Sequence, residues 1–250
     1  MISNQLKMQV KSGNTLIGAW LSVPCVSVAE AMASCGFDWM AVDFEHSAIS
    51  IETAIDCFIA AERWQVSTIA RLPCAEPYMA RRLLDGGANG LIVPVVESVA
   101  EFKQFAKYCS YPPMGKRGVG LGRANTWGDE FDSYFRDFSP VLVPQIETIT
   151  GVKVATDLIA LDCVDALFVG PYDLSVSLGQ PGNFDTLEFK NAMSQLKLVC
   201  SENGKPLGIH QVTPDTSELK ARLEEGFRFI AFGTDLIALR HIFKNIKKAL

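Results

Sequence analysis

The stretch 141–175, VLVPQIETITGVKVATDLIALDCVDALFVGPYDLS, contains a complete strand–helix–strand unit. Residues 141–146 form an apolar β-type run, 152–161 have helical periodicity, and 166–169 form a second apolar run. Short strands that are hydrophobic throughout are typical of parallel sheets covered on both faces. This unit therefore predicts a parallel α/β fold.

The same alternation recurs along the whole chain. Strands are expected at 16–22, 39–44, 67–72, 90–96, 141–146, 166–169, 207–210 and 229–232, and helices at 29–35, 51–64, 77–84, 99–109, 152–161, 187–201, 217–225 and 236–250. This pattern predicts a closed (β/α)₈ TIM barrel that forms a single domain over 1–250. A doubly wound open sheet is the alternative, although no GxGxxG motif follows the first strand. The longest irregular insertion, 111–140, is expected to be a functional loop.

Composition excludes several classes of protein. A chain of 250 residues with 48% hydrophobic residues can bury a full core, and its formal charge of −5 without a long basic run argues against nucleic-acid binding. No apolar run approaches the ~20 residues that a membrane span requires, and 1–10 lack a signal-peptide stretch. The chain has seven cysteines, which is an odd number, and none of them forms a CxxC pair. This pattern argues against a disulfide framework and predicts a reducing, cytoplasmic location.

Two carboxylates follow consecutive strands of the opening unit. Glu147 comes just after 141–146, and Asp173 follows 166–169. The carboxyl ends of parallel strands form the ligand-binding edge of α/β folds. Carboxylates that converge there suit a hard divalent cation. The alternative is that both acids are helix caps or turn residues.

Other strand ends carry reactive groups too. The second strand runs into Asp43, Glu45 and His46, where a histidine beside carboxylates could act as a base. Arg71 ends the third strand and needs an anion, which is either a substrate oxygen or a barrel carboxylate such as Glu147. The alternative for His46 is a loop histidine in a salt bridge.

Three further side chains can be interpreted as functional or as structural. Trp20 is more often a core residue than a substrate wall, His210 fits a pocket role or plain packing, and His241 is expected to be structural. His46, Arg71, Glu147 and Asp173 would share one rim of a barrel. A metal, a base and an anion-stabilising arginine suit chemistry through an enolate. No lysine is placed on a strand, which argues against a Schiff-base route.

Together these motifs resemble the HpcH/HpaI aldolases, which are metal-dependent class II pyruvate aldolases of the phosphoenolpyruvate/pyruvate superfamily. The resemblance spans nearly the whole chain and depends on the order and spacing of several short runs. They are GFDW at 36–39, DFEH at 43–46, RLP at 71–73, RLLDGGA at 82–88, YPP at 111–113, RGVG at 117–120, QIET at 145–148 and GPYDLS at 170–175.

The resemblance implies roles for matching positions. Glu147 and Asp173 would hold Mg²⁺, Mn²⁺ or Co²⁺, His46 would be the base oriented by Asp43, and Arg71 would hold the 2-oxo group. The implied substrate-binding residues are Trp20, Gln145, Gly170, Pro171 and Tyr172. Glu45 would touch metal-bound water, and Asp85 would enter the site of a neighbouring subunit in a homotrimer or homohexamer with the last helix packed on a neighbour.

The implied reaction is the reversible aldol cleavage of a 4-hydroxy-2-oxo acid, such as 4-hydroxy-2-oxoheptanedioate or 2-dehydro-3-deoxyglucarate, to pyruvate and an aldehyde. The alternatives are another carbon–carbon lyase of the same superfamily and a non-catalytic barrel that binds a 2-oxo acid. Tyr172 and Trp127 depart from residues common in the family, and this leaves the size of the substrate open.

Overall fold

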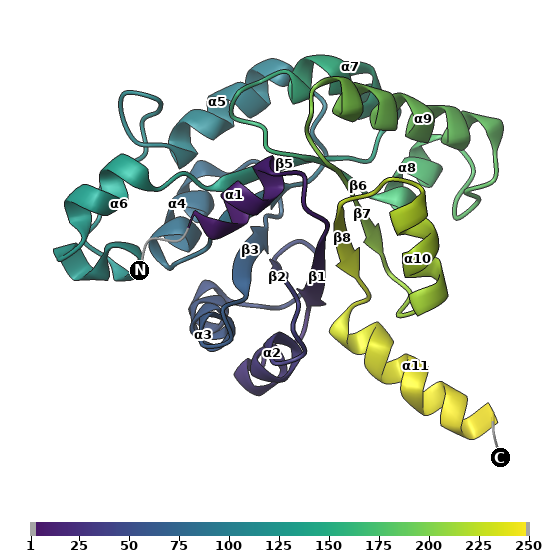
Figure 1. Cartoon of the computed structure of the whole chain (residues 1–250), viewed down its shortest axis with the longest axis horizontal. Coiled ribbons are helices and arrows are strands. Elements are labelled where there is room, and N and C mark those ends of the chain that lie inside the picture. The colour runs from purple at the N-terminus through teal and green to yellow at the C-terminus, as the bar shows by residue number, and fades with distance from the viewer. Residues whose placement is uncertain (1–3, 249–250) are drawn as a thin grey trace.

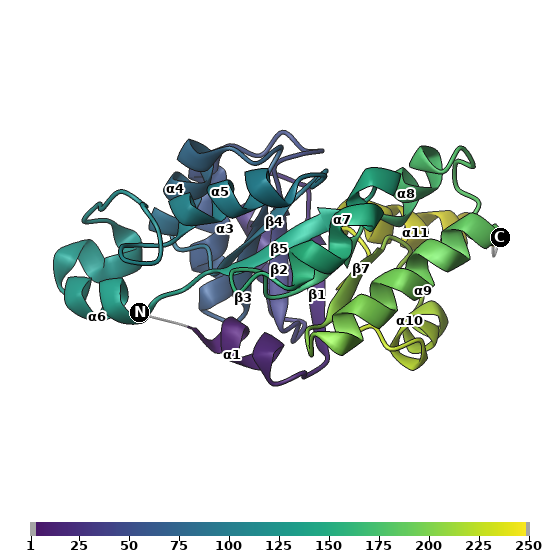
Figure 2. The ribbon, with the colours of Figure 1, turned by 90° about the horizontal axis from the view of Figure 1, so that it is seen from above.

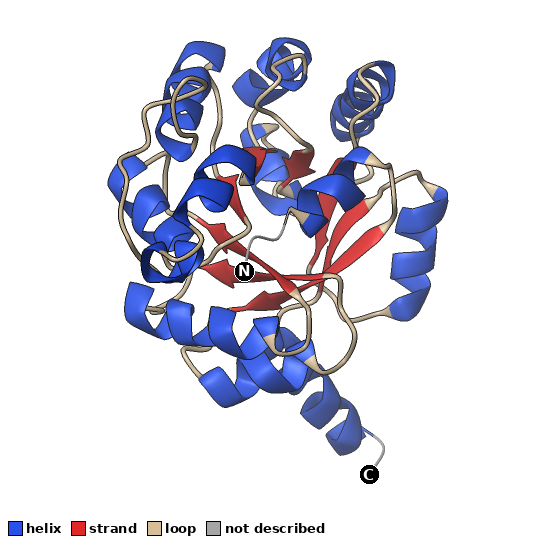
Figure 3. Ribbon diagram, turned by 60° about the vertical axis from the view of Figure 1, so that its left-hand side comes forward, coloured by secondary structure: helices blue, strands red, loops and turns tan. Residues whose placement is uncertain are grey.

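The strands form one closed parallel barrel. The computed structural model describes residues 4–248. Its strands run in the order β1 to β8, and β1 pairs with β8 to close the barrel (Figure 3). This confirms the expected TIM barrel and excludes the doubly wound sheet. The strands are β1 (Leu16–Leu21), β2 (Trp39–Asp43), β3 (Ser67–Arg71), β4 (Gly90–Val93), β5 (Val141–Ile146), β6 (Leu167–Val169), β7 (Leu207–Gln211) and β8 (Phe229–Phe232).

The expected helices lie outside the barrel. Ser50, Ser98, Thr148 and Thr186 each accept a hydrogen bond from the backbone N–H three residues later, which explains where α3, α5, α7 and α9 begin. The helices are α2 (Val26–Ala33), α3 (Ile51–Glu62), α4 (Pro77–Asp85), α5 (Val99–Cys109), α7 (Ile149–Ile159), α9 (Leu187–Glu202), α10 (Thr216–Glu224) and α11 (Asp235–Lys248). The last residues of the expected helix, 249 and 250, lie outside the described residues.

Four short helical elements are absent from the sequence-based prediction. They are α1 (Gln5–Lys11), the 3₁₀ segment η1 (Arg123–Gly128), α6 (Phe131–Asp137) and α8 (Pro171–Ser177). Helix α1 lies at one end of the barrel (Figure 2), where Leu6 and Val10 join the interior cluster. Leu6 and Val10 are the two residues of α1 that are buried. Two apolar positions are too few to establish a helical period, so the sequence does not predict this helix.

Aromatic side chains fill the barrel. The ring of Trp39 stacks on Phe229 at 4.4 Å between centroids, and Trp20 stacks on Phe168 at 6.1 Å. Gly18 of β1 makes room for Trp39, because a Cβ at this position would lie 2.2 Å from the indole ring. The interior is therefore a packed core, and a ligand must bind at the mouth.

The insertion 111–140 is more ordered than a loop. It contains η1 and α6, and Arg117 fastens it to the end of α4 through Asp85, with 2.6 Å between Nη2 and Oδ1. The Arg117 guanidinium is buried and lies 4.7 Å from the ring of Tyr111. These contacts correct the expectation of an irregular segment.

Helix α11 extends away from the barrel (Figure 1). Large apolar side chains along it are exposed, namely Leu236, Leu239, Ile242, Phe243 and Ile246. Within residues 4–248, no helix combines the length and hydrophobicity that crossing a bilayer demands.

Candidate active site

A cavity of about 230 Å³ opens at the carboxyl ends of the strands. Most residues that the sequence singled out line it, namely Trp20, Asp43, His46, Arg71, Gln145, Gly170, Pro171, Tyr172 and Asp173. Ser22, His210, Val212 and Thr234 complete the described lining, which includes no lysine. The barrel therefore brings together groups that are up to 214 positions apart, from Trp20 to Thr234.

Asp43 and Arg71 form a buried, bidentate ion pair. Arg71 donates from Nε to Oδ1 at 2.9 Å and from Nη2 to Oδ2 at 2.7 Å. Trp20 Nε1 donates to Oδ2 at 3.2 Å, and the backbone N–H of Glu45 donates to Oδ1 at 3.0 Å. Burial opposes ionisation of Asp43, but Arg71 together with the other donors outweighs it and holds the pKa of Asp43 below its usual value.

Arg71 also contacts a second carboxylate. Its Nη1 lies 2.9 Å from Oε2 of Glu45, in a charge contact without hydrogen-bond geometry. Its guanidinium lies 4.8 Å from the centroid of the Trp20 ring. The protein anion that Arg71 finds is thus Asp43 with Glu45, and not Glu147. A guanidinium has more N–H donors than these contacts use, so Arg71 can still donate into the cavity.

His46 is exposed at the rim of the cavity. Its backbone N–H donates to Asp43 Oδ1 at 3.3 Å, and this main-chain contact is the one that joins the two residues. The expectation that Asp43 orients the imidazole is not met in this structure. The reason is that the Asp43 carboxylate already receives Arg71, Trp20 and two backbone N–H groups.

Glu147 contacts Gln145 of the cavity lining and is nearly fully buried, with 4% of its surface exposed. The backbone N–H of Val95 donates to Oε1 at 2.6 Å, and the Gln145 side-chain amide donates to Oε2. Thr148, not Glu147, caps α7 by accepting from Gly151 N–H. The cap interpretation of Glu147 is therefore wrong.

Val95 holds an unusual backbone conformation in making this contact. Its φ of 50° is uncommon for a β-branched residue, and such strain costs about 1–3 kcal/mol. The turn aims the Val95 N–H at Glu147. Sequence reasoning missed Val95, because a backbone donor leaves no signal in residue type.

Asp173 lies in the first turn of α8, which begins at Pro171 and has Gly170 as its N-cap residue. The residue is exposed, unlike Glu147. A Cβ on Gly170 would lie 2.5 Å from Glu147 Oε2 and 2.8 Å from Gln145 Nε2, so only glycine fits beside this pair. Gly170 thus allows β6 and α8 to approach Glu147 closely.

The carboxylates of the site repel one another. Burial first, and then the charges of Glu45 and Asp173, raise the pKa of Glu147 to about 7 against the effect of its two hydrogen bonds. Burial, Asp43 and Asp173 likewise raise the pKa of Glu45 despite Arg71. A divalent cation bound by Glu147 and Asp173 would relieve this repulsion and favour the charged form of Glu147.

The described residues do not form a complete metal cage. Among residues 4–248, no group of three or more His, Cys, Asp or Glu side chains is arranged to hold a metal ion. Glu147 and Asp173 would supply only part of a coordination sphere. Hard cations such as Mg²⁺ commonly use one or two carboxylates and keep the other positions for substrate and water, so the donor set fits.

Asp85 lies outside the cavity. Its carboxylate pairs with Arg117, and none of the insertion 111–140 is among the residues that line the cavity. Within one described chain, the insertion that was expected to be a functional loop therefore does not line the cavity.

Known proteins resemble this chain over almost its full length. The sequence profile of the HpcH/HpaI aldolase/citrate lyase family matches residues 16–242. The chain belongs to this family. It is 34% identical to the hydroxypyruvate/pyruvate aldolase of Roseobacter denitrificans, over 97% of this chain and 95% of that protein. It is 33% identical to the 4-hydroxy-2-oxo-heptane-1,7-dioate aldolase of Escherichia coli, over 95% of this chain and 91% of that protein.

A solved structure has nearly the same fold. A family member from Burkholderia cenocepacia superposes with a TM-score of 0.92 at 29% identity and covers 99% of both chains. Together with the aldolase relatives, this establishes the chain as a carbon–carbon lyase.

Proposed function

We propose that this enzyme catalyses the reversible aldol cleavage of a 4-hydroxy-2-oxo acid to pyruvate and an aldehyde. The observation that carries the proposal is that His46, Arg71 and Asp173 line one cavity, with Glu147 buried against its lining residues Gln145 and Gly170. The names of its relatives support it, because they are aldolases of hydroxypyruvate and pyruvate, 5-keto-4-deoxy-D-glucarate and 4-hydroxy-2-oxo-heptane-1,7-dioate.

Glu147 and Asp173 would hold a divalent cation, which we propose to be Mg²⁺, Mn²⁺ or Co²⁺. HpcH/HpaI aldolases generally depend on such an ion. When bound, it would act as a Lewis acid that polarises the 2-oxo group of the substrate. The fit is supported by the raised pKa of Glu147, since a nearby cation would favour its charged form.

The side chains of the cavity would perform the proton and charge transfers. His46 takes the proton from the C4 hydroxyl, and the C3–C4 bond breaks as that oxygen becomes the aldehyde carbonyl. The electron pair of the broken bond forms a C2–C3 double bond, and the 2-oxo oxygen takes the negative charge. The product of this step is the enolate of pyruvate. Spare N–H donors of Arg71 stabilise the enolate oxygen, held in place by Asp43. Protonation at C3 then gives pyruvate.

Pyruvate release tests this proposal. Cleavage of a 4-hydroxy-2-oxo acid is followed by coupling to lactate dehydrogenase in buffer with a fixed Mn²⁺ concentration. Glu147→Gln and Asp173→Asn should each lose most of the activity, and Arg71→Lys should be severe because lysine lacks the planar fork. Wild-type turnover by Glu147→Gln or Asp173→Asn would contradict the scheme.

We further propose that the enzyme is a homo-oligomer, a trimer or hexamer, in the cytoplasm. The exposed apolar side chains of α11, such as Leu239, Ile242 and Phe243, support an interface between copies of the chain. In such an assembly Asp85 could reach a neighbouring site. The seven unpaired cysteines support a reducing compartment.

A further inference from the structure

His210 is a half-buried histidine that the proposed reaction does not use. It lies near the end of β7, and its imidazole stacks on the indole of Trp20 with 4.3 Å between centroids and 26° between planes. Trp20 in turn contacts Asp43 and Arg71. Trp20 therefore separates His210 from the ion pair of the catalytic cavity and contacts both.

A backbone carbonyl determines which ring nitrogen carries the hydrogen. Nε2 of His210 lies 3.1 Å from the carbonyl oxygen of Gly233. A carbonyl oxygen can only accept, so Nε2 must donate. Burial lowers the pKa of His210 to about 4, and Arg71 opposes protonation further, so the ring is neutral at neutral pH. The neutral ring with hydrogen on Nε2 has its lone pair on Nδ1.

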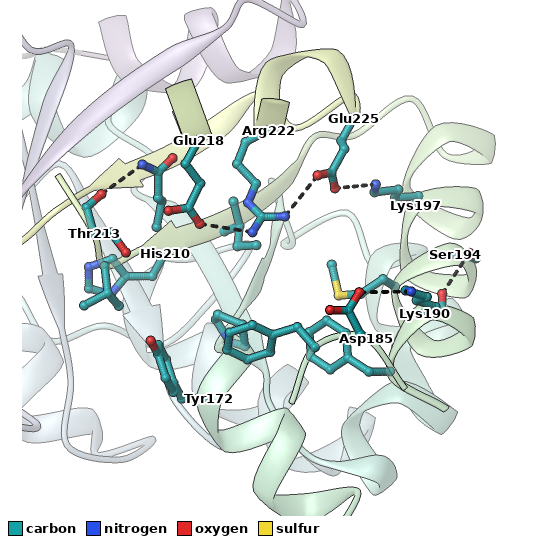
Figure 4. Close-up of a pocket in the computed structure, with 17 residues that line it drawn as sticks. Tyr172, Asp185, Lys190, Ser194, Lys197, His210, Thr213, Glu218, Arg222 and Glu225 are labelled. Carbon is teal, nitrogen blue, oxygen red and sulfur yellow. Dashed lines mark hydrogen bonds and ion pairs between the residues drawn. The ribbon is translucent and has the colours of Figure 1, made fainter. Parts of the chain in front are cut away.

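The Nδ1 lone pair is free to bind a ligand. Within residues 4–248, Nδ1 has no hydrogen-bond partner. It is also not fully enclosed by the protein, so a ligand can reach it. His210 lines the 230 Å³ cavity and also a larger, adjoining cavity of about 680 Å³ between α9 and α10. In Figure 4 His210 and Tyr172 lie on the same side of this larger cavity, away from its ion pairs at Lys190 and Arg222.

We propose that His210 is a specificity-determining residue whose Nδ1 accepts a hydrogen bond from a hydroxyl group of the substrate. The inference rests on the proposed aldol reaction and names a substrate class within it. Carbonyl and carboxylate groups cannot donate to Nδ1. The neighbouring positive charge of Arg71 disfavours an ammonium donor. A neutral hydroxyl, either on the aldehyde or on C3 of the oxo acid, satisfies both conditions.

Two pairs of compounds of matched shape distinguish these sources. Glycolaldehyde and propionaldehyde are each condensed with pyruvate, and hydroxypyruvate and 2-oxobutyrate are each condensed with one common aldehyde. In each pair a hydroxyl replaces a methyl group, and the measured quantity is the ratio of kcat/KM for the hydroxylated to the alkyl compound. A net hydrogen bond of ordinary strength makes that ratio about tenfold larger in the presence of the acceptor.

Two variants separate the nitrogens of the ring. In His210→Gln the amide can still reach Gly233 but leaves no acceptor at the Nδ1 position. In His210→Asn the side-chain oxygen can take the place of Nδ1. We expect the ratio to fall about tenfold in His210→Gln in one of the two pairs, and to be largely restored in His210→Asn. The pair that responds identifies which partner carries the hydroxyl. His241→Gln, a matched change on α11, should leave both ratios at the wild-type value.

Unchanged ratios in both His210 variants would overturn the inference while leaving the aldol reaction intact. No carbon–carbon bond formation by the wild type with any of the four compounds would instead overturn the proposed function, and the inference with it. A measurement on the wild type tests the inference even if the variants fail to fold. With ¹⁵N-labelled histidine, the Nδ1 resonance of His210 should shift with a hydroxylated compound and not with its alkyl counterpart. Equal shifts for both members of both pairs would reject the role of His210.

Discussion

Asp43 of β2 and Arg71 of β3 are direct partners in the strand register, and their side chains form a bidentate ion pair at 2.9 and 2.7 Å. Both residues end their strands. Because a slip of the register would separate them, the ion pair reports that these two strands are correctly aligned. The same alignment places the Arg71 guanidinium against Trp20 at the mouth of the cavity.

The first prediction concerns the stability of this pair. Asp43→Ala leaves a buried guanidinium with only Glu45 as a partner, and it should lower the free energy of unfolding by about 3 kcal/mol. The double variant Asp43→Ala/Arg71→Met removes both charges and should recover part of this loss. Urea unfolding monitored by circular dichroism measures both values. The loss of unfolding free energy in the double variant is compared with the summed losses of Asp43→Ala and Arg71→Met. A loss in the double variant larger than that sum would show that the ion pair is not the source of the effect.

The second prediction concerns Glu147 and pH. Its pKa is raised to about 7 in the folded protein, whereas an unfolded glutamate titrates near its model value of 4.5. Between these values the folded state holds a proton that the unfolded state has lost, so stability falls as pH rises. In metal-free protein this loss should amount to about 3 kcal/mol between pH 4.5 and pH 7.

Glu147→Gln is the control for this pH effect. It cannot ionise, so its stability should decline less than that of the wild type from pH 5 to pH 8, when both are treated with a chelator and unfolded in urea. Adding Mn²⁺ at pH 8 should raise the melting temperature of the wild type more than that of the variant. Parallel pH profiles would show that Glu147 does not carry the pH dependence.

The third prediction concerns Gly170. Gly170→Ala would place a methyl group 2.5 Å from Glu147 Oε2, so the carboxylate or β6 must shift. We expect a loss of activity of about 100-fold and weaker binding of Mn²⁺, because small misplacements at a reacting centre are costly. Gly120→Ala is the matched control, since its nearest neighbour would lie at 3.5 Å and its backbone is not in the left-handed region. Full activity of Gly170→Ala would mean that this close packing is dispensable.

The fourth prediction concerns assembly through α11. Ile242→Asp introduces a charge among the exposed apolar side chains of this helix, and it should shift the protein to a smaller species. Size-exclusion chromatography with light scattering measures the mass. Arg240→Asp adds an acid to the same helix outside that apolar set and should leave the mass unchanged. A wild type with the mass of one 27.4 kDa chain would reject the oligomer.

Much of the site was predictable because its side chains follow strands. Gln145 and Asp43 lie on recognisable β runs, and the barrel places every such strand end at one rim. The sequence does not predict the short helix α8, because Gly170-Pro171, its N-cap and first residue, is equally typical of a loop. The sequence does not decide between the two roles of His210, since its tautomer depends on the carbonyl of Gly233, 23 positions away.

By itself the sequence determined the eight strands, the main helices between them and the reactive residue types at the barrel mouth, because hydrophobic periodicity and strand ends are local properties. The tertiary structure alone decided which groups meet. Arg71 pairs with Asp43, the strained Val95 turn donates to Glu147, and Trp20 covers His210. These contacts depend on the closure of the barrel and on backbone conformation, and neither is encoded in the identity of a single residue.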